Sequence, residues 1–243
     1  MSFQRPIEGW DTSLGFNYTR ISIRDRKGNI SPQDDQGNAL SLSNNGVDNL
    51  ATVSFSATKD YRDNRLNPTE GSILKLSTEQ SISLGLGNVS MNRVEANYSQ
   101  FKPVKLFKSE KPQVLAVNVQ GGTVIGELPP YDTFSLGGTN SDGGYGAGDL
   151  SNTRTYVLAS AEYRFPVFKA LGVGRVVFAD YASDLGTSVT VGNKSSGANS
   201  KSGTGFGYGA GLRFNCPLGL IRADYGLNDR GESQLHFGIG HRF

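Results

Sequence analysis

The stretch from residue 205 to residue 215 reads Gly-Phe-Gly-Tyr-Gly-Ala-Gly-Leu-Arg-Phe-Asn. Its even-numbered positions, from Phe206 to Phe214, are apolar or aromatic, whereas its odd-numbered positions are glycine or polar and end with Arg213 and Asn215. Successive side chains of a β-strand point to opposite faces of the sheet. The stretch therefore predicts a long strand with one apolar face and one face of small or polar residues.

The same alternation recurs with charges on the polar face. The segment 93 to 99 carries Arg93 and Glu95 there, and the segment 154 to 165 carries Glu162 and Arg164. A wet barrel interior accommodates such pairs, while the apolar face meets lipid. A soluble sandwich would also alternate, but it would bury the apolar face in a core. The pattern favours the membrane barrel and leaves the sandwich as the alternative.

Long polar loops alternate with tight turns along the chain. The loops at 24 to 49 and 184 to 204 are long and rich in glycine, serine and charge, whereas the turn at 216 to 219 is short. This asymmetry is typical of outer-membrane barrels, and no stretch approaches the roughly 18 apolar residues of a membrane helix. We predict an all-β fold, a transmembrane antiparallel up-and-down β-barrel of about ten strands, an even number that is compatible with closure.

Composition and single residues exclude several other functions. The 24 basic and 22 acidic residues nearly cancel, so nucleic acid is not an expected partner. With Cys216 as the one cysteine and His236 and His241 as the two histidines, neither a disulfide nor a metal site is predicted, and no cofactor is expected.

Catalysis is not predicted either. A Ser/His/Asp triad would need His236 or His241, which period two places on opposite faces of one strand, His236 towards the lumen and His241 at the membrane interface. The glycine-rich stretch from Gly137 to Gly148 is not followed by the Gly-Lys-Ser/Thr of a phosphate-binding loop.

The first ten residues, Met1 to Trp10, contain neither the apolar core nor the small-residue cleavage site of a secretory signal peptide. We therefore expect either an excerpt of a longer chain or a shortened family member that reaches its membrane by another route.

Several motifs in the same order resemble the Omp85 (BamA-like) family of barrels. The residues that carry the resemblance are Arg62 to Asn64 with Pro68 to Ser72, Phe134 to Tyr145, Ala161 to Pro166, Phe178 to Asp180, Gly207 to Arg213, Pro217 to Gly226 and Leu235 to Phe243. The last of these is similar to the cyanobacterial or plastid version of the closing strand. The resemblance covers essentially the whole chain.

This resemblance implies a set of functional residues. In the family, a lid loop folds back into the barrel; its tip here is Gly137, Gly138, Asn140, Ser141, Asp142, Gly143, Gly144 and Tyr145. The expected lumen partners are Glu162, Arg164, Asp180, Arg213 and Arg222. We expect Phe237, Ile239 and Phe243 to share one face of the closing strand and to form an assembly signal.

One departure from the family pattern concerns the lid tip. Family members read Val-Arg-Gly-Tyr where this chain has Asp142, Gly143, Gly144 and Tyr145, so the arginine that is thought to pair with the aspartate equivalent to Asp180 is missing. A guanidinium holds a carboxylate in a way that glycine cannot. Asp180 would then need Arg164, Arg213, Arg222 or water, and we expect a mobile lid that leaks ions.

The second departure is size. Family barrels have roughly sixteen strands, within the range of outer-membrane barrels, and follow soluble POTRA domains. This chain resembles the C-terminal part of such a barrel and carries no POTRA domain over residues 1 to 243. If about ten strands do not close, a second copy or another chain would have to complete the barrel.

Two functions follow from the resemblance. The first is assembly or translocation at a Gram-negative or cyanobacterial outer membrane or a plastid outer envelope, with membrane lipids and unfolded outer-membrane proteins as partners. The alternative is a small passive pore or structural barrel, favoured by the missing arginine and the missing POTRA domains, whereas the retained lid-flanking motifs favour the first.

Overall fold

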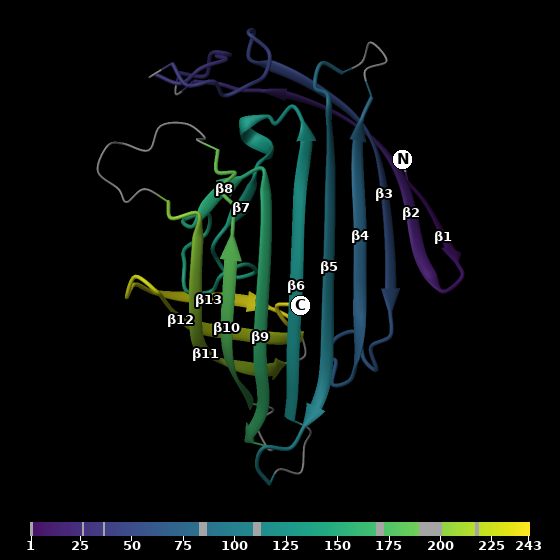
Figure 1. The fold of residues 1–243 in the computed structure, drawn as a ribbon, viewed down its shortest axis with the longest axis vertical. Coiled ribbons are helices and arrows are strands. Elements are labelled where there is room, and N and C mark those ends of the chain that lie inside the picture. Colours follow the sequence, from purple (N-terminus) through teal and green to yellow (C-terminus); the bar gives the residue numbers. More distant parts are fainter. Residues whose placement is uncertain are drawn as a thin grey trace.

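A computed structural model describes residues 2–25, 27–35, 37–82, 87–108, 113–168, 173–189, 201–216 and 219–243. The fold is almost entirely β (Figure 1). Its elements are β1 Ser2–Ile7, β2 Trp10–Ser22, β3 Val47–Asp60, β4 Gly71–Ser81, β5 Met91–Val104, β6 Gln113–Gly126, η1 Pro130–Asp132, β7 Phe134–Leu136, β8 Ser151–Thr153, β9 Thr155–Phe168, β10 Val173–Ser183, β11 Thr204–Cys216, β12 Gly219–Asn228 and β13 Ser233–Ile239.

Eleven strands form one sheet in the order β1-β2-β3-β4-β5-β6-β9-β10-β11-β12-β13, and each neighbouring pair is antiparallel. The prediction of an all-β, up-and-down sheet of about ten strands is confirmed, since the main sheet of the described residues has eleven. Its first strand, β1, turns into β2 at Glu8 and Gly9, both at positive φ. Pro6 does not prevent this because β1 lies at the sheet edge, where a missing N–H is tolerated.

The sheet curls around two short strands. Figure 1 shows β4, β5, β6 and β9 upright, with β11 to β13 crossing behind β9 and β10 and β7 and β8 lying within the curl. The strands β7 and β8 pair with each other and form a separate small sheet. They belong to the connection between β6 and β9, residues 127–154, which we call the lid segment.

The outer face of the sheet is apolar and exposed. On β11, Phe206, Tyr208, Leu212 and Phe214 are all exposed, as the alternation predicted. Exposed apolar residues occupy the same face of the neighbouring strands, among them Val177, Tyr181, Ile221, Tyr225, Val117, Val119, Phe16 and Tyr18. A soluble sandwich would bury this face, so its exposure identifies the surface that lipid covers.

The inner face is small, polar and charged. On β11, Gly205, Gly207, Gly211 and Arg213 are buried between their exposed neighbours.

Three predicted connections lie partly outside the described residues, namely positions 26 and 36 of the loop at 24 to 49, positions 190–200 of the loop at 184 to 204 and positions 217–218 of the turn at 216 to 219. Within the described part of the chain, no helix is long and apolar enough to cross a membrane, and no group of three or more histidine, cysteine, aspartate or glutamate residues is placed to hold a metal ion.

Candidate functional site

The lid segment is anchored first at its base. Arg93 of β5 pairs with Asp132 of η1, with 2.7 Å between Nη2 and Oδ1, and its guanidinium lies 4.3 Å from the centre of the Phe134 ring. The Tyr131 hydroxyl donates to Asp48 of β3 across 2.9 Å. These contacts hold the start of the lid segment against the β3 to β5 side of the sheet.

The lid then makes a tight tip. Gly137 and Gly138 both have positive φ, 105° and 97°, a conformation that a side chain disfavours. The amide of Ser141 donates to the Gly138 carbonyl, and the Gly138 amide donates to the Asp142 carbonyl, each across 3.0 Å. The glycine pair therefore closes the loop and turns Asp142 and Gly143 towards β10 to β13.

Glycines of β11 and β12 form the seat for this tip. A Cβ on Gly207 would overlap the Asp142 carboxylate, and a Cβ on Gly226 would overlap the Gly143 carbonyl. At Gly205, a Cβ would lie 2.6 Å from the Tyr145 ring. The glycine-rich face that the sequence predicted thus leaves room for the lid to approach the strand backbones closely.

Asp180 of β10 holds the tip. Its side chain is fully buried, and its Oδ2 accepts from the Gly143 amide across 2.9 Å. The same oxygen accepts from Nη2 of Arg242 across 2.8 Å. The expectation that Asp180 needs Arg164, Arg213, Arg222 or water was therefore wrong, because a cation arrives from beyond the end of β13.

Arg242 binds the lid as well as Asp180. Its Nε donates to the Thr139 carbonyl across 3.0 Å, and its Nη2 donates to the Ser141 carbonyl across 2.9 Å. The guanidinium lies 5.0 Å from the Phe178 ring centre, and the side chain is 3% exposed. The lid tip is thus docked, contrary to the mobile lid that the missing arginine predicted.

Further polar contacts join the tip to β12 and β13. Arg222 donates to the Asn140 side chain across 2.8 Å, and His236 Nε2 lies 3.1 Å from the Gly143 carbonyl. Tyr145 hydrogen-bonds to Asp229, just after β12. His236 therefore faces the lumen, as predicted.

The remaining predicted lumen residues form an ion-pair cluster beside the tip. Glu162 pairs with Arg164 across 2.8 Å, and its other oxygen lies 3.8 Å from Arg213. Arg213 also pairs with Asp224 of the next strand. The structure thus brings Glu162, Arg164 and Arg213 together, whereas Arg222 contacts the lid instead.

The chain turns inward after β13. Gly240 has φ of 82°, and its amide donates to the Leu220 carbonyl across 2.7 Å. Beyond it, Phe243 packs against a buried cluster on the opposite strands β4 to β6, made of Ile73, Phe101, Val114 and Ala116. We call residues Gly240–Phe243 the inward segment.

This turn corrects two predictions. Phe237 and Ile239 lie on the outer face and are 69% and 77% exposed, but Phe243 lies inside, so the three residues do not share a face. His241 does not continue the outer face of β13, since its Nε2 lies 2.9 Å from the side-chain oxygen of Asn67 in the β3–β4 turn. The reason for both errors is the backbone reversal at Gly240.

Sequence reasoning missed Arg93, Asp224 and Arg242 as site residues. Period two offered a signal for the last two, because Asp224 and Arg242 share parity with the lumen residues Arg222 and His236 on their strands. Among the described residues, the contacts of His236 and His241 do not form a Ser/His/Asp arrangement, since Nε2 of His236 lies against the Gly143 carbonyl and Nε2 of His241 lies against the Asn67 side chain.

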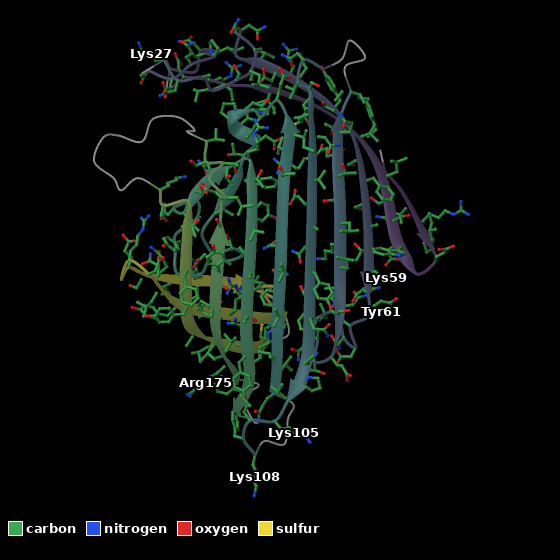
Figure 2. All side chains as sticks on the ribbon, viewed as in Figure 1. Lys27, Lys59, Tyr61, Lys105, Lys108 and Arg175 are labelled. Carbon is green, nitrogen blue, oxygen red and sulfur yellow. The ribbon has the colours of Figure 1, made fainter. Side chains whose placement is uncertain are left out.

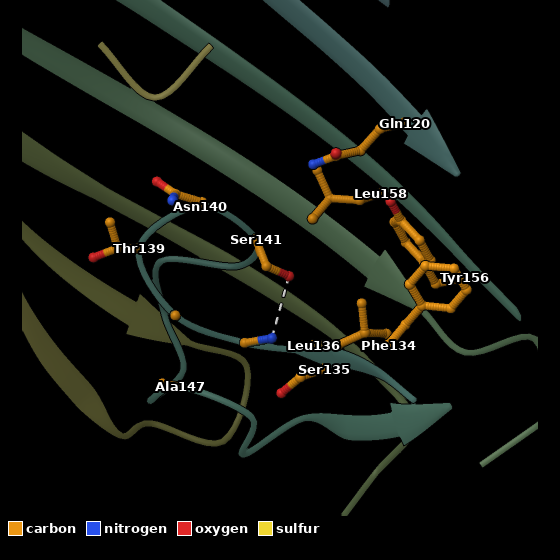
Figure 3. Close-up of a pocket in the computed structure, with 12 residues that line it drawn as sticks. Gln120, Phe134, Ser135, Leu136, Thr139, Asn140, Ser141, Ala147, Tyr156 and Leu158 are labelled. Atoms are coloured by element: carbon orange, nitrogen blue, oxygen red, sulfur yellow. Dashed lines mark hydrogen bonds between the residues drawn. The ribbon is translucent and has the colours of Figure 1, made fainter. Parts of the chain in front are cut away.

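A cavity of about 350 Å³ lies between the lid and the wall formed by β6 and β9 (Figure 3). The lid contributes Ser135, Thr139, Asn140 and Ser141 to the lining. At the rim of the cavity, the Gly137 amide donates a hydrogen bond of 3.2 Å to the Ser141 hydroxyl. The wall contributes Gln120, Tyr156 and Leu158. None of the described residues that line this space is charged, in contrast to the ion-pair cluster of Glu162, Arg164 and Arg213.

A curved antiparallel sheet with an apolar outer face and a lid held on an inner aspartate defines a transmembrane barrel domain of the outer-membrane type. A family model described as the Omp85 superfamily domain matches residues 1–243. This chain therefore belongs to the Omp85 superfamily, in its plastid type, and its location is an outer membrane or a plastid outer envelope.

Relatives and solved structures agree with this assignment. The chain is 32% identical over 243 residues to Outer envelope protein 80, chloroplastic, of Oryza sativa subsp. japonica, covering 100% of this chain and 35% of that protein. It is 30% identical over 214 residues to Protein TOC75, chloroplastic, of Pisum sativum, covering 85% of this chain and 25% of that one.

Among solved structures, BamA from Haemophilus ducreyi lacking POTRA domains 1-3 matches with a TM-score of 0.73 at 19% identity. The match covers 98% of this chain and 52% of that chain. At this identity the likeness shows the fold alone. The chain thus spans about half of that structure and about a third of the rice relative.

Proposed function

We propose that residues 1–243 form part of an Omp85-type barrel domain that takes part in inserting or translocating client proteins at its membrane. The clients are unfolded outer-membrane proteins, and membrane lipids surround the apolar outer face. The proposal includes no enzymatic reaction, no cofactor and no nucleic-acid partner. The assembly-signal role of Phe237, Ile239 and Phe243 stays a prediction.

The observation that carries this proposal is the docked lid. The lid tip is held on Asp180 by its own Gly143 amide and by Arg242, with all three groups buried. The lid is also held at its base by Arg93 and Asp132, so it has one defined docked position inside the sheet. A transporter that must open for a client and close afterwards requires such a closed state.

The alternative of a passive pore or structural barrel rested chiefly on the missing lid arginine. Asp180 nevertheless has a guanidinium partner, because Arg242 supplies one from another part of the chain. The retained lid-flanking residues, above all Asp180 and the glycine seat, therefore weigh in favour of the assembly or translocation function.

Reconstitution of the 243-residue chain in liposomes tests the proposal. A urea-unfolded outer-membrane barrel is added as client, and its protease-protected, heat-modifiable form is measured. We expect more folded client than with empty liposomes, and a loss of that gain in Arg242→Gln. The matched control is Arg175→Gln, because Arg175 lies on the outer side of β10, away from the lid (Figure 2). A chain that conducts ions but does not raise client insertion would support the passive pore.

A further inference from the structure

The inward segment fills two separate and chemically different sites inside the barrel. The Arg242 side chain enters a polar site between the lid and β10, and the Phe243 side chain enters an apolar site on β4 to β6. The chain reaches both by leaving the sheet at Gly240. A short stretch of peptide therefore already behaves as a ligand of the barrel interior.

The first site has the acceptors that a guanidinium needs. The Asp180 carboxylate and the carbonyls of Thr139 and Ser141 take hydrogen bonds of 2.8, 3.0 and 2.9 Å from two nitrogen atoms of Arg242. The Phe178 ring covers the guanidinium at 5.0 Å. The planar, forked guanidinium reaches these three acceptors from two of its nitrogen atoms while it lies against the ring.

The second site has the shape and surface that an aromatic ring needs. Ile73, Phe101, Val114 and Ala116 are buried and surround Phe243. Arg164 lies 5.4 Å from the centre of the Phe243 ring, so one side of the site is a cation that favours a π-system over an aliphatic side chain. The two sites together therefore bind an arginine that is followed by an aromatic residue.

The occupied state leaves polar groups without partners. Among the described residues, buried atoms that lack a hydrogen bond include Nη1 of Arg242, Nδ1 of His241 and Nη1 of Arg164, all in or beside the inward segment. The inward segment lies beyond the last register pair of β12 and β13, Ile221 with Ile239, so the side chains of Arg242 and Phe243 make the contacts that a competing segment must replace.

We propose that these two sites form a receptor in the barrel lumen for an extended peptide segment with arginine followed by an aromatic residue, occupied at rest by Gly240–Phe243. The ligand that replaces Gly240–Phe243 is such a segment of a client protein, an assignment that rests on the proposed function. Because the inward segment is tethered, it competes at a high effective concentration and keeps the receptor closed to weak ligands.

A peptide-binding experiment tests this receptor. The variant Arg242→Ala/Phe243→Ala empties both sites without shortening the chain, and a fluorescent peptide, Ile-Gly-His-Arg-Phe, is titrated against it in detergent by polarisation. We expect saturable binding to this variant and at least tenfold weaker binding to the parent chain. Peptides with arginine replaced by glutamine or phenylalanine replaced by serine should each lose at least tenfold.

A site variant locates the binding. Adding Asp180→Asn to the emptied chain should make the arginine and glutamine peptides bind equally, whereas adding Asp11→Asn, on exposed β2, should preserve their difference. Absence of binding to the emptied chain, or binding that ignores both peptide residues, overturns the proposal. So does a difference that persists in Asp180→Asn.

The peptide-binding result can be distinguished from the result of the insertion assay. Peptide binding in detergent with no client insertion in liposomes would leave the receptor standing and remove the proposed function. Client insertion that proceeds while the emptied chain binds no peptide would remove the receptor alone.

Discussion

Arg242 and Gly143 together make the contacts with Asp180 that a single lid arginine is expected to make. Gly143 contributes its amide to Asp180, and Arg242 contributes the positive charge from the inward segment. The pair is buried, so the charge-assisted bond contributes more than an exposed ion pair would. The lid and the end of β13 are consequently held by the same carboxylate.

The first prediction concerns Arg242→Gln. Glutamine cannot supply the charge to Asp180, and we expect a loss of about 1 to 3 kcal/mol of lid docking, which is roughly a 5- to 150-fold shift towards the undocked state. Planar-bilayer conductance should rise, and protease should cut the lid faster. Asp180→Asn should give a similar effect, and the double variant should cost less than the sum of the two. Additive effects would show that the two residues act independently.

The second prediction places the missing arginine back. A Cβ on Gly143 would lie 3.3 Å from Asp180 Oδ2 and 3.0 Å from the Phe178 ring, so both side chains must shift by a few tenths of an ångström to admit it. In the parent, Gly143→Arg with Asp142→Val should change conductance little, because Arg242 already occupies Asp180. In Arg242→Gln the same pair of changes should restore low conductance. Failure to restore it would mean that the position of the cation, and not only its charge, holds the lid.

At the level of elements, the glycines of β11 and β12 decide how closely the lid approaches the sheet. The third prediction compares two glycines of the sheet. Gly207→Ala should push the tip away, since its Cβ overlaps Asp142, whereas Gly174→Ala meets only ordinary contacts at 3.6 and 3.7 Å. We expect higher conductance and lower thermal stability for Gly207→Ala only. Equal conductance and equal thermal stability of the two variants would show that the glycine seat accommodates a Cβ without displacing the lid tip.

The fourth prediction concerns the β3–β4 turn. The Thr69 hydroxyl, which donates to Asp63 across 2.6 Å, together with main-chain donors, lowers the pKa of Asp63 to about 2. A lowered folded pKa means that the ionised form stabilises the turn; this stabilisation is complete above about pH 4 and is lost as the pH falls through about 2. Protease cleavage within the turn should rise over this range. Asp63→Asn should remove the pH dependence, and an unchanged profile would contradict the assignment.

The alternation in the sequence predicted which face of the sheet a residue occupies better than it predicted where a strand ends. The residues 205 to 214 and the pair Glu162 and Arg164 lie where period two places them, because a strand with one buried face has a fixed register. The turn at Gly240 could not be read in this way, since glycine suits a strand as well as a left-handed turn. The docking of Arg242 therefore required the structure.

For the whole molecule, the number of strands restricts how the sheet can be completed. Strands of an antiparallel sheet alternate in direction, so the first and the eleventh, β1 and β13, run the same way. Direct pairing of these two would create one parallel seam in an otherwise antiparallel sheet. An open edge in lipid leaves backbone groups without partners, which is costly.

We therefore expect the 243-residue chain, when studied alone, to pair β13 with β13 of a second copy, because two-fold symmetry makes that pairing antiparallel. In a Cys216→Ser background, single cysteines at each position from Ser233 to Ile239 should give disulfide-linked dimers with one clear maximum, and the native mass in detergent should be that of a dimer. The alternative is tested with Gln4→Cys/Gln234→Cys. Efficient cross-linking of these two positions within a monomer would show that the sheet closes on itself through the parallel seam, and that no second copy is needed.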